Sequence, residues 1–112
     1  MEITIFKDLK DVATSHDVDL RKYVLSAAGK YPEGKMIDFS QYKLSPSENI
    51  QMESNNELIL IIQSEGVLKI VSDKEIMADT HDLVTIPQNT SVTFTNPEKY
   101  PSLFYCLHWS LD

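Results

Sequence analysis

Several residue types that commonly build catalytic or binding sites are scarce in this sequence of 112 residues. It contains one cysteine, Cys106, so no disulfide can form within the chain. With three glycines it has no glycine-rich loop of the kind that wraps a phosphate group. Ten basic side chains stand against 17 acidic ones, and the net charge of -7 repels phosphate backbones. We therefore expect no binding of nucleic acid by this chain alone.

Long apolar runs are missing as well. No stretch approaches the roughly 20 apolar residues that a membrane-spanning helix needs. The opening Met-Glu-Ile-Thr-Ile-Phe lacks the basic start of a signal peptide. We therefore expect a cytoplasmic protein without a membrane partner. A chain of this length suits one domain with a real core, because it can bury roughly 60–70% of its unfolded surface.

Short apolar segments with a period of two dominate the rest of the chain. Residues 57–71 form an aliphatic run broken by Gln63-Ser64-Glu65-Gly66, where the glycine can adopt the positive φ of a tight hairpin turn. Residues 82–87 lead to a proline, and residues 91–96 return with strict alternation. The same patterns predict strands at 36–42, 50–54, 74–77 and 102–110. Eight or more short strands separated by turn residues are typical of a barrel or a sandwich.

The first thirty-four residues follow a different pattern. Residues 1–6 alternate as an edge strand would, whereas apolar residues between Leu9 and Ala28 recur at intervals of three and four, which predicts two short helices. A DNA-binding helix-turn-helix is the weaker interpretation, because Asp17 and Asp19 would begin the helix that approaches the phosphates. We assign residues 1–34 to a strand and helical arm packed on a barrel of residues 35–112, as one domain.

The hairpins and the last strand together resemble a known family. Gly66 at a hairpin turn, an acidic turn before the strand that ends Ile86-Pro87, and Asn96 nine residues after that proline resemble the two sequence motifs of the cupin barrel. Residues 103–109, Leu-Phe-Tyr-Cys-Leu-His-Trp, resemble the aromatic last strand of the cupin sensor domain in AraC-type transcription regulators. The resemblance covers roughly residues 36–110. It implies an all-β fold, a cupin-like double-stranded β-helix or jelly-roll barrel, to which the N-terminal helical arm would be added.

The ligand positions of metal-binding cupins carry unsuitable side chains in this sequence. Counted from the glycine and the asparagine of the two motifs, the resemblance places these positions at Met52, Ser54, Ile59 and Val92. None of them binds a hard or borderline cation well, and a register that includes Glu57 supplies one carboxylate without imidazole partners. We therefore predict a barrel without a metal or another cofactor. A metal-dependent isomerase or dioxygenase is the alternative that metal analysis would test.

The histidines and the cysteine give little support for catalysis. His16 is expected on the surface and His81 in a turn, where histidine tolerates a positive φ. His108 lies two residues from Cys106 on one strand, and a core histidine bonded to the backbone is as good an interpretation as a site residue. No third group that would orient the imidazole is evident, and nothing indicates an oxyanion hole. We therefore expect a protein that is not an enzyme.

The predicted ligand site is the interior of the barrel. The resemblance places seven residues there: Met52, Ser54, Val92, Phe94, Phe104, Cys106 and His108. Because the set is mostly apolar, the small-molecule effector is either a sugar, as the family suggests, or a more apolar metabolite. Alternate residues of the last strand, Leu103, Tyr105, Leu107 and Trp109, then face outward. Their apolar area needs cover from the helical arm or from a second copy, and we expect a homodimer.

The resemblance also implies a function in transcription regulation. The expected function is that of the effector-sensing, dimerising domain of an AraC-family regulator, which binds a small molecule in a metal-free barrel. The helix-turn-helix modules that bind DNA in that family are not among these residues. The alternative is a standalone metal-free cupin-like protein that binds a small molecule or has a structural role, without a function in transcription.

Overall fold

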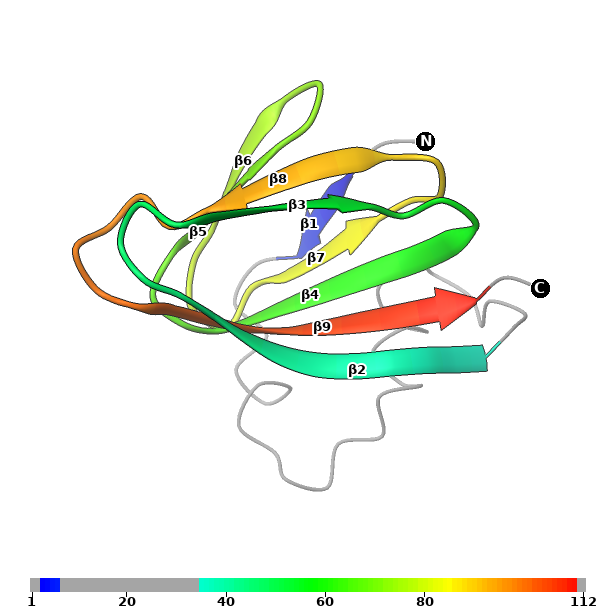
Figure 1. Cartoon of the computed structure of the whole chain (residues 1–112), viewed down its shortest axis with the longest axis horizontal. Coiled ribbons are helices and arrows are strands. Elements are labelled where there is room, and N and C mark those ends of the chain that lie inside the picture. The colour runs from blue at the N-terminus through cyan, green and yellow to red at the C-terminus, as the bar shows by residue number, and fades with distance from the viewer. Residues whose placement is uncertain (1–2, 7–34, 111–112) are drawn as a thin grey trace.

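A computed structural model describes residues 3–6 and 35–110, which form two antiparallel sheets facing each other (Figure 1). The five-stranded sheet has the order β1-β7-β4-β9-β2, and the four-stranded sheet has the order β3-β8-β5-β6. The strands are β1 (Thr4–Phe6), β2 (Lys35–Leu44), β3 (Asn49–Glu53), β4 (Glu57–Glu65), β5 (Leu68–Val71), β6 (Glu75–Ala78), β7 (Leu83–Ile86), β8 (Ser91–Thr95) and β9 (Ser102–Ser110). The all-β prediction is confirmed for these residues. The helices predicted between residues 7 and 34 lie outside them.

Strand β9 shows how side-chain alternation divides the molecule into an inner and an outer layer. It pairs with β2 on one side and with β4 on the other. Phe104 and Cys106 belong to the core between the sheets, whereas Leu107 and Trp109 pack in a second cluster on the opposite face. The predicted facing of this strand is therefore confirmed. Within the described part of the chain, no helix has the length and apolar character needed to cross a membrane.

The inner core is made of aliphatic and aromatic side chains from both sheets. Phe104 is its centre, since its ring lies 5.4 Å from that of Tyr42 and 5.5 Å from that of Phe94, measured between ring centroids. The buried members are Leu44, Ile59, Ile61, Leu68, Ile70, Ala78, Val84, Ile86, Val92, Phe94, Phe104 and Cys106. Full burial of one large apolar side chain contributes about 1.5–3 kcal/mol, so this layer is the main source of stability.

The outer cluster explains why residues 58–62 form a continuous apolar run. Strand β4 lies between β7 and β9, and both of its faces are buried. Inward Ile59 and Ile61 join the core, while outward Leu60 and Ile62 pack with Leu83, Leu107 and Trp109. Trp109 is only 4% exposed in a single chain. The predicted shielding of this tryptophan therefore does not require a second copy, and the homodimer stays a prediction.

Two turn residues have the backbone conformation that the sequence predicts. Gly66 has a φ of 78° after β4, and His81 has a φ of 74° before β7. A Cβ atom on Gly66 would lie 2.7 Å from the carbonyl oxygen of Pro101, so the position needs glycine for space as well as for conformation. The turn at His81 is closed by Asp82, whose carboxylate accepts a hydrogen bond from the Asp79 amide at 2.8 Å.

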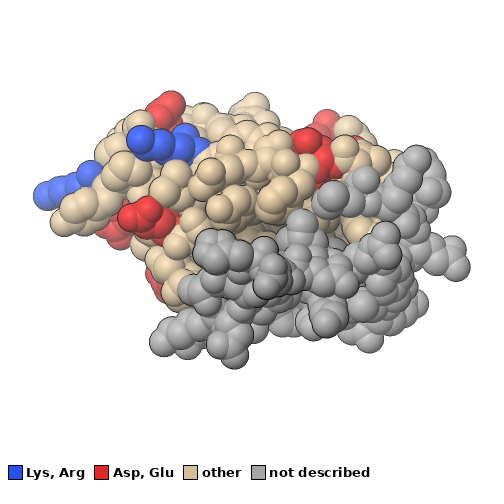
Figure 2. Space-filling view, turned by 90° about the horizontal axis from the view of Figure 1, so that it is seen from below, with Lys and Arg blue, Asp and Glu red and all other residues tan. Residues whose placement is uncertain are grey.

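The barrel has two ends that differ in their polar side chains. At the closed end, β4 ends at Glu65, β8 ends at Thr95, just before Asn96, and β9 begins at Ser102. At the open end, β4 begins at Glu57 and β9 passes His108. Figure 2 views the molecule from below and shows acidic side chains at both ends of the described surface on this side, with basic ones at the closed end.

Candidate functional site

Buried polar side chains at the closed end bond to loops and neighbouring strands. The amide nitrogen of Asn96 donates to the carbonyl oxygens of Leu44 at 3.0 Å and of Tyr100 at 2.6 Å, and its side-chain oxygen accepts from the Glu98 amide at 2.9 Å. Gln63 Nε2 lies 2.9 Å from the hydroxyl of Ser102. These groups hold the strand connections in place, so the closed end is structural.

Ser54 has the same kind of role at the open end. Its hydroxyl donates to the carbonyl oxygen of Pro87 at 2.7 Å and accepts from the Thr90 amide at 2.9 Å. A backbone bond of 2.9 Å from Ser54 to Thr90 supports the same contact. The residue is fully buried. Although Ser54 is one of the predicted ligand residues, the structure shows it joining the corner before β4 to the turn before β8.

A chain of three side chains runs inward from the mouth of the open end. Glu57 Oε2 lies 2.7 Å from His108 Nδ1, and His108 Nε2 lies 3.4 Å from Cys106 Sγ. A carboxylate can only accept, so Nδ1 carries the proton and, in the neutral ring, Nε2 is left to accept from the thiol. Glu57 is therefore the orienting group that the sequence did not reveal. Its contact depends on the register of β4 and β9, which pairs Ile59 with His108.

Cys106 lies at the inner end of this chain and is fully buried. Burial raises the pKa of its thiol to about 12, and the nearby carboxylates of Asp38 and Glu57 act in the same direction. Burial and the neighbouring Cys106 and Asp38 also raise the pKa of Tyr42. At neutral pH the thiol keeps its proton, and a thiol is a poor nucleophile. Cys106 Sγ also approaches Met52 Sδ to 3.9 Å.

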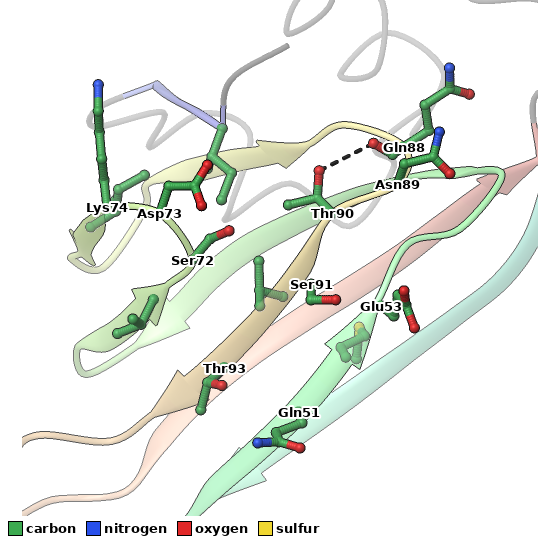
Figure 3. A pocket seen from close by; sticks show the side chains of 15 residues that line it. Gln51, Glu53, Ser72, Asp73, Lys74, Gln88, Asn89, Thr90, Ser91 and Thr93 are labelled. Carbon is green, nitrogen blue, oxygen red and sulfur yellow. Dashed lines mark hydrogen bonds between the residues drawn. The ribbon is translucent and has the colours of Figure 1, made fainter.

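A hollow of about 1170 Å³ opens beyond Met52 at the same end (Figure 3). Most of its lining is polar and comes from strand ends and turns that are far apart in the sequence. The lining residues are Ile3, Gln51, Met52, Glu53, Val71, Ser72, Asp73, Lys74, Ile76, Gln88, Asn89, Thr90, Ser91, Val92 and Thr93. Apart from Met52 and Val92, sequence patterns did not indicate these residues, because the turns meet only when both sheets are in place.

The seven predicted ligand residues thus fall into separate groups. Met52 and Val92 line the hollow. Phe94 and Phe104 have no exposed area and fill the core. Met52, Cys106 and His108 are in contact with one another through the sulfur atom of the cysteine. That these residues bind a ligand stays a prediction.

Comparison with known proteins identifies the fold. No family model matches this sequence, and a search of curated proteins gives no match. A solved structure of a predicted oxalate decarboxylase from Thermotoga maritima aligns with a TM-score of 0.65 and 16% identity over 69% of each chain. A Cupin 2 conserved barrel domain protein from Salinispora arenicola aligns with a TM-score of 0.61 and 20% identity, over 64% of this chain and 61% of its own. The fold is a cupin fold.

A third cupin-fold neighbour is a protein solved together with a partner. Drosophila melanogaster CENP-C bound to CAL1 aligns with a TM-score of 0.56 and 13% identity, over 62% of this chain and 60% of its own. This chain spans about three fifths of the Salinispora and Drosophila structures. At such identities the likeness concerns the fold alone. The predicted cupin barrel is confirmed, and its place in a transcription regulator stays a prediction.

The divalent metal site known from cupins does not fit the side chains in this barrel. Of the matching positions, Ile59 and Val92 are buried in the apolar core, and the Ser54 hydroxyl is engaged by Pro87 and Thr90. The fourth, Met52, offers only a thioether. Within residues 3–6 and 35–110, no three or more His, Cys, Asp or Glu side chains are grouped so that they could hold a metal ion. No chemistry can be assigned to a divalent ion at these positions.

Proposed function

We propose that this chain is the effector-sensing cupin domain of an AraC-type transcription regulator. Its effector is a polar small molecule of the size of a sugar, bound in the hollow at the open end. The observation that carries the proposal is the hollow itself, with its volume of about 1170 Å³ and its polar lining. Small-molecule sites have volumes of roughly 300–1,000 Å³, so a ligand of that class has room there.

The lining offers both donors and acceptors from opposite sides of the hollow. Gln51 and Thr93 come from paired strands, and Asn89 comes from the turn before β8 (Figure 3). Asp73 and Lys74 come from the turn between β5 and β6, so both signs of charge are present. Such a set suits a neutral ligand with several hydroxyl groups. The expectation of a polar effector is favoured over that of an apolar metabolite on this ground.

We infer that the domain binds its effector without transforming it. The Cys106 thiol has a pKa raised to about 12 and no exposed area, so it is not an activated nucleophile. The hollow contains Glu53 and Asp73, which are both exposed, and lacks histidine. A role in sensing therefore accounts for the site better than an enzymatic one.

A thermal-shift screen with sugars and other polar metabolites tests ligand binding. A ligand present at a hundred times its dissociation constant stabilises the folded state by about 2.7 kcal/mol, which raises the melting temperature by several degrees. Ser91→Trp, which places a large side chain at the hollow, is expected to abolish the shift, and Gln51→Ala to reduce it. Gln41→Ala, at an exposed position of β2, is the matched control. A shift that survives Ser91→Trp would contradict the assignment of the hollow.

The regulator context is tested by the genomic reading frame. A helix-turn-helix module encoded in frame with this domain supports the proposal. In that case, reporter transcription from the neighbouring promoter should respond to the ligand found in the screen, and the response should be lost in Ser91→Trp. A complete reading frame that encodes no DNA-binding module would contradict the proposed function in transcription regulation. The result of the ligand screen would still stand.

The second candidate function is that of a standalone protein with a binding or structural role. In that role the domain would form a homodimer. Two apolar side chains are exposed on β2, the edge strand of the five-stranded sheet: Ile37 at 48% and Phe39 at 40%. The Phe39 ring stacks on Tyr105 at 5.4 Å between centroids, so the patch is continuous with β9. The CENP-C neighbour, solved in complex with CAL1, shows that a cupin-fold protein can bind another protein.

We propose that a second copy of this domain covers the patch of Ile37, Phe39 and Tyr105. Light scattering should then give the mass of a dimer for the wild-type chain and of a monomer for Phe39→Glu. Gln51→Glu adds one negative charge at an exposed position of β3, in the other sheet, and it should leave the dimer intact. A wild-type monomer at high protein concentration would contradict the dimer.

A further inference from the structure

We propose that Met52, Cys106 and His108 bind one soft monovalent cation, Cu(I), just inside the open end of the barrel. The three side chains supply a thioether sulfur, a thiol sulfur and an imidazole nitrogen. Cys106 Sγ lies 3.9 Å from Met52 Sδ and 3.4 Å from His108 Nε2. They come from two strands of different sheets, β3 and β9, so the site lies between the sheets.

The distances between these donors are those of ligands around one ion. Sulfur and nitrogen ligands lie about 2.3 Å and about 2.0 Å from a metal of this size. At tetrahedral or trigonal angles, two such sulfurs are about 3.8–4.0 Å apart, and a sulfur and a nitrogen are about 3.5–3.7 Å apart. The observed sulfur–sulfur separation of 3.9 Å lies within the first range, and the sulfur–nitrogen separation of 3.4 Å is about 0.1 Å below the second. For both of these donor pairs, an ion therefore requires little change in separation.

Glu57 prepares the histidine for this role. Its carboxylate oxygen lies 2.7 Å from His108 Nδ1, which fixes the proton on that nitrogen. The lone pair of Nε2 then points toward Cys106, where a metal ligand must present it. A carboxylate behind a ligating histidine is a common arrangement in metal sites, and its removal typically weakens metal binding by about 10- to 100-fold.

The chemistry of the donors selects a soft monovalent ion. Thioether and thiolate sulfur prefer Cu(I), whereas hard divalent ions prefer oxygen ligands. One thiolate and one monovalent cation form a neutral pair, which suits the buried position of Cys106. As the sulfur–copper bond forms, the thiol proton leaves to solvent, and neither the copper nor the sulfur changes oxidation state. The carboxylates of Asp38 and Glu57, which disfavour the bare thiolate, favour a cation at the same place.

This site differs from the divalent site of metal cupins, with which it shares only the position of Met52. The predicted absence of a metal rests on the ligand preferences of hard and borderline cations. A soft monovalent cation at this second position would be an exception to it. The inference does not depend on the proposed small-molecule effector. A metabolite that stabilises copper-free protein supports the effector whatever the outcome with copper.

A competition titration tests the site directly. Tag-free protein is titrated anaerobically with Cu(I) in the presence of the chelator bathocuproine disulfonate, whose copper complex is coloured. We expect one copper bound per chain and, in native mass spectra, a mass gain of one copper less one proton. X-ray absorption should show two sulfur neighbours and one nitrogen neighbour. Binding well below one copper per chain, or a copper coordinated by nitrogen and oxygen alone, would overturn the proposal.

Matched variants separate the site from adventitious binding. Cys106→Ala and Met52→Leu are expected to lower the affinity at least 100-fold, and Glu57→Gln by about 10- to 100-fold. Met52→Leu nearly conserves side-chain volume, so its melting temperature in copper-free buffer should match the wild type. Met77→Leu changes an exposed methionine on β6 and should bind copper as the wild type does. Equal affinity in the wild type, Met52→Leu and Cys106→Ala would overturn the proposal.

Discussion

The two ends of the barrel use their polar side chains in opposite ways. At the closed end, Asn96 forms three hydrogen bonds to backbone groups, and Gln63 bonds to Ser102 across the strands. At the open end, Glu57, His108 and Cys106 bond to one another. At the closed end, side chains bond mainly to backbone groups and hold connections together, whereas at the open end Glu57, His108 and Cys106 bond to other side chains. The difference separates the structural end of this domain from the end where function is expected.

Ser54 is the exception at the open end and shows how the site is kept in shape. By bonding to Pro87 and Thr90, it fixes the turn before β8 against the corner before β4. Both segments border the region where Met52 and the hollow lie. At the open end, the structural contacts of Ser54 thus lie beside the side-chain group of Glu57, His108 and Cys106.

Truncating one side chain at each end should produce the largest difference in the free energy of unfolding. Asn96→Ala removes three hydrogen bonds and leaves two carbonyl oxygens without this partner, so we expect a loss of about 3 kcal/mol in the free energy of unfolding. His108→Ala removes contacts within a partly exposed group and should cost about 1 kcal/mol. Urea unfolding of both variants measures the difference. Equal costs would mean that the open end is as structural as the closed end.

Alkaline pH should destabilise the open end through Cys106. Its pKa is raised from the ordinary value of 9.0 to about 12 in the folded state. Above pH 9 the unfolded chain loses this proton while the folded chain keeps it, so stability present below pH 9 is lost as the pH rises toward 12. Relative to neutral pH, the expected loss at about pH 10.5 is about 2 kcal/mol. Urea unfolding of Cys106→Ala should lack this component, and identical pH profiles would contradict the burial of the thiol.

A surface ion pair on the β5–β6 hairpin provides a small effect for comparison. Lys69 Nζ and Glu75 Oε1 are 3.0 Å apart, with side chains 35% and 58% exposed. Glu75→Gln should cost about 0.5 kcal/mol or less, because water and salt screen exposed pairs. Unfolding at low and high salt measures it, and the cost should vanish at high salt. A larger effect that persists in salt would show that charges near the hollow contribute to the fold.

Removal of divalent metals should leave the stability of the domain unchanged. The side chains at the cupin ligand positions do not fit such an ion, so its binding energy does not contribute to folding. The melting temperature in excess EDTA should equal that in buffer alone, and dialysed protein should contain no stoichiometric Mn, Fe, Ni or Zn. A melting temperature lowered by EDTA and restored by one divalent ion would contradict the description of the open end.

Local sequence patterns were sufficient for much of the fold. Alternation along residues 102–110 predicted which residues of β9 share a face, and the resemblance to cupins assigned the inner face. Gly66 and His81 marked two turns that have a positive φ. These features depend on neighbours within one strand or turn. The resemblance to cupins added the topology, which local patterns leave open.

The candidate site was harder to predict because it depends on contacts between distant segments. Glu57 and His108 are 51 residues apart and meet only through the register of β4 with β9. That register shifts between Gln63 and Glu65, and no sequence pattern indicates such an irregularity. The hollow is formed by strand ends and turns of both sheets. In the sequence, its polar side chains therefore look like ordinary turn residues.

Trp109 is an intrinsic fluorescent probe of this domain. It is the single tryptophan of the sequence, and it lies next to His108 in β9 with its ring on the outer face, 4% exposed. Any ligand that moves β9 will change the packing around this ring while touching only the opposite face of the strand. The emission spectrum of the unmodified protein can therefore report movements of β9 at the open end in real time, without an added dye.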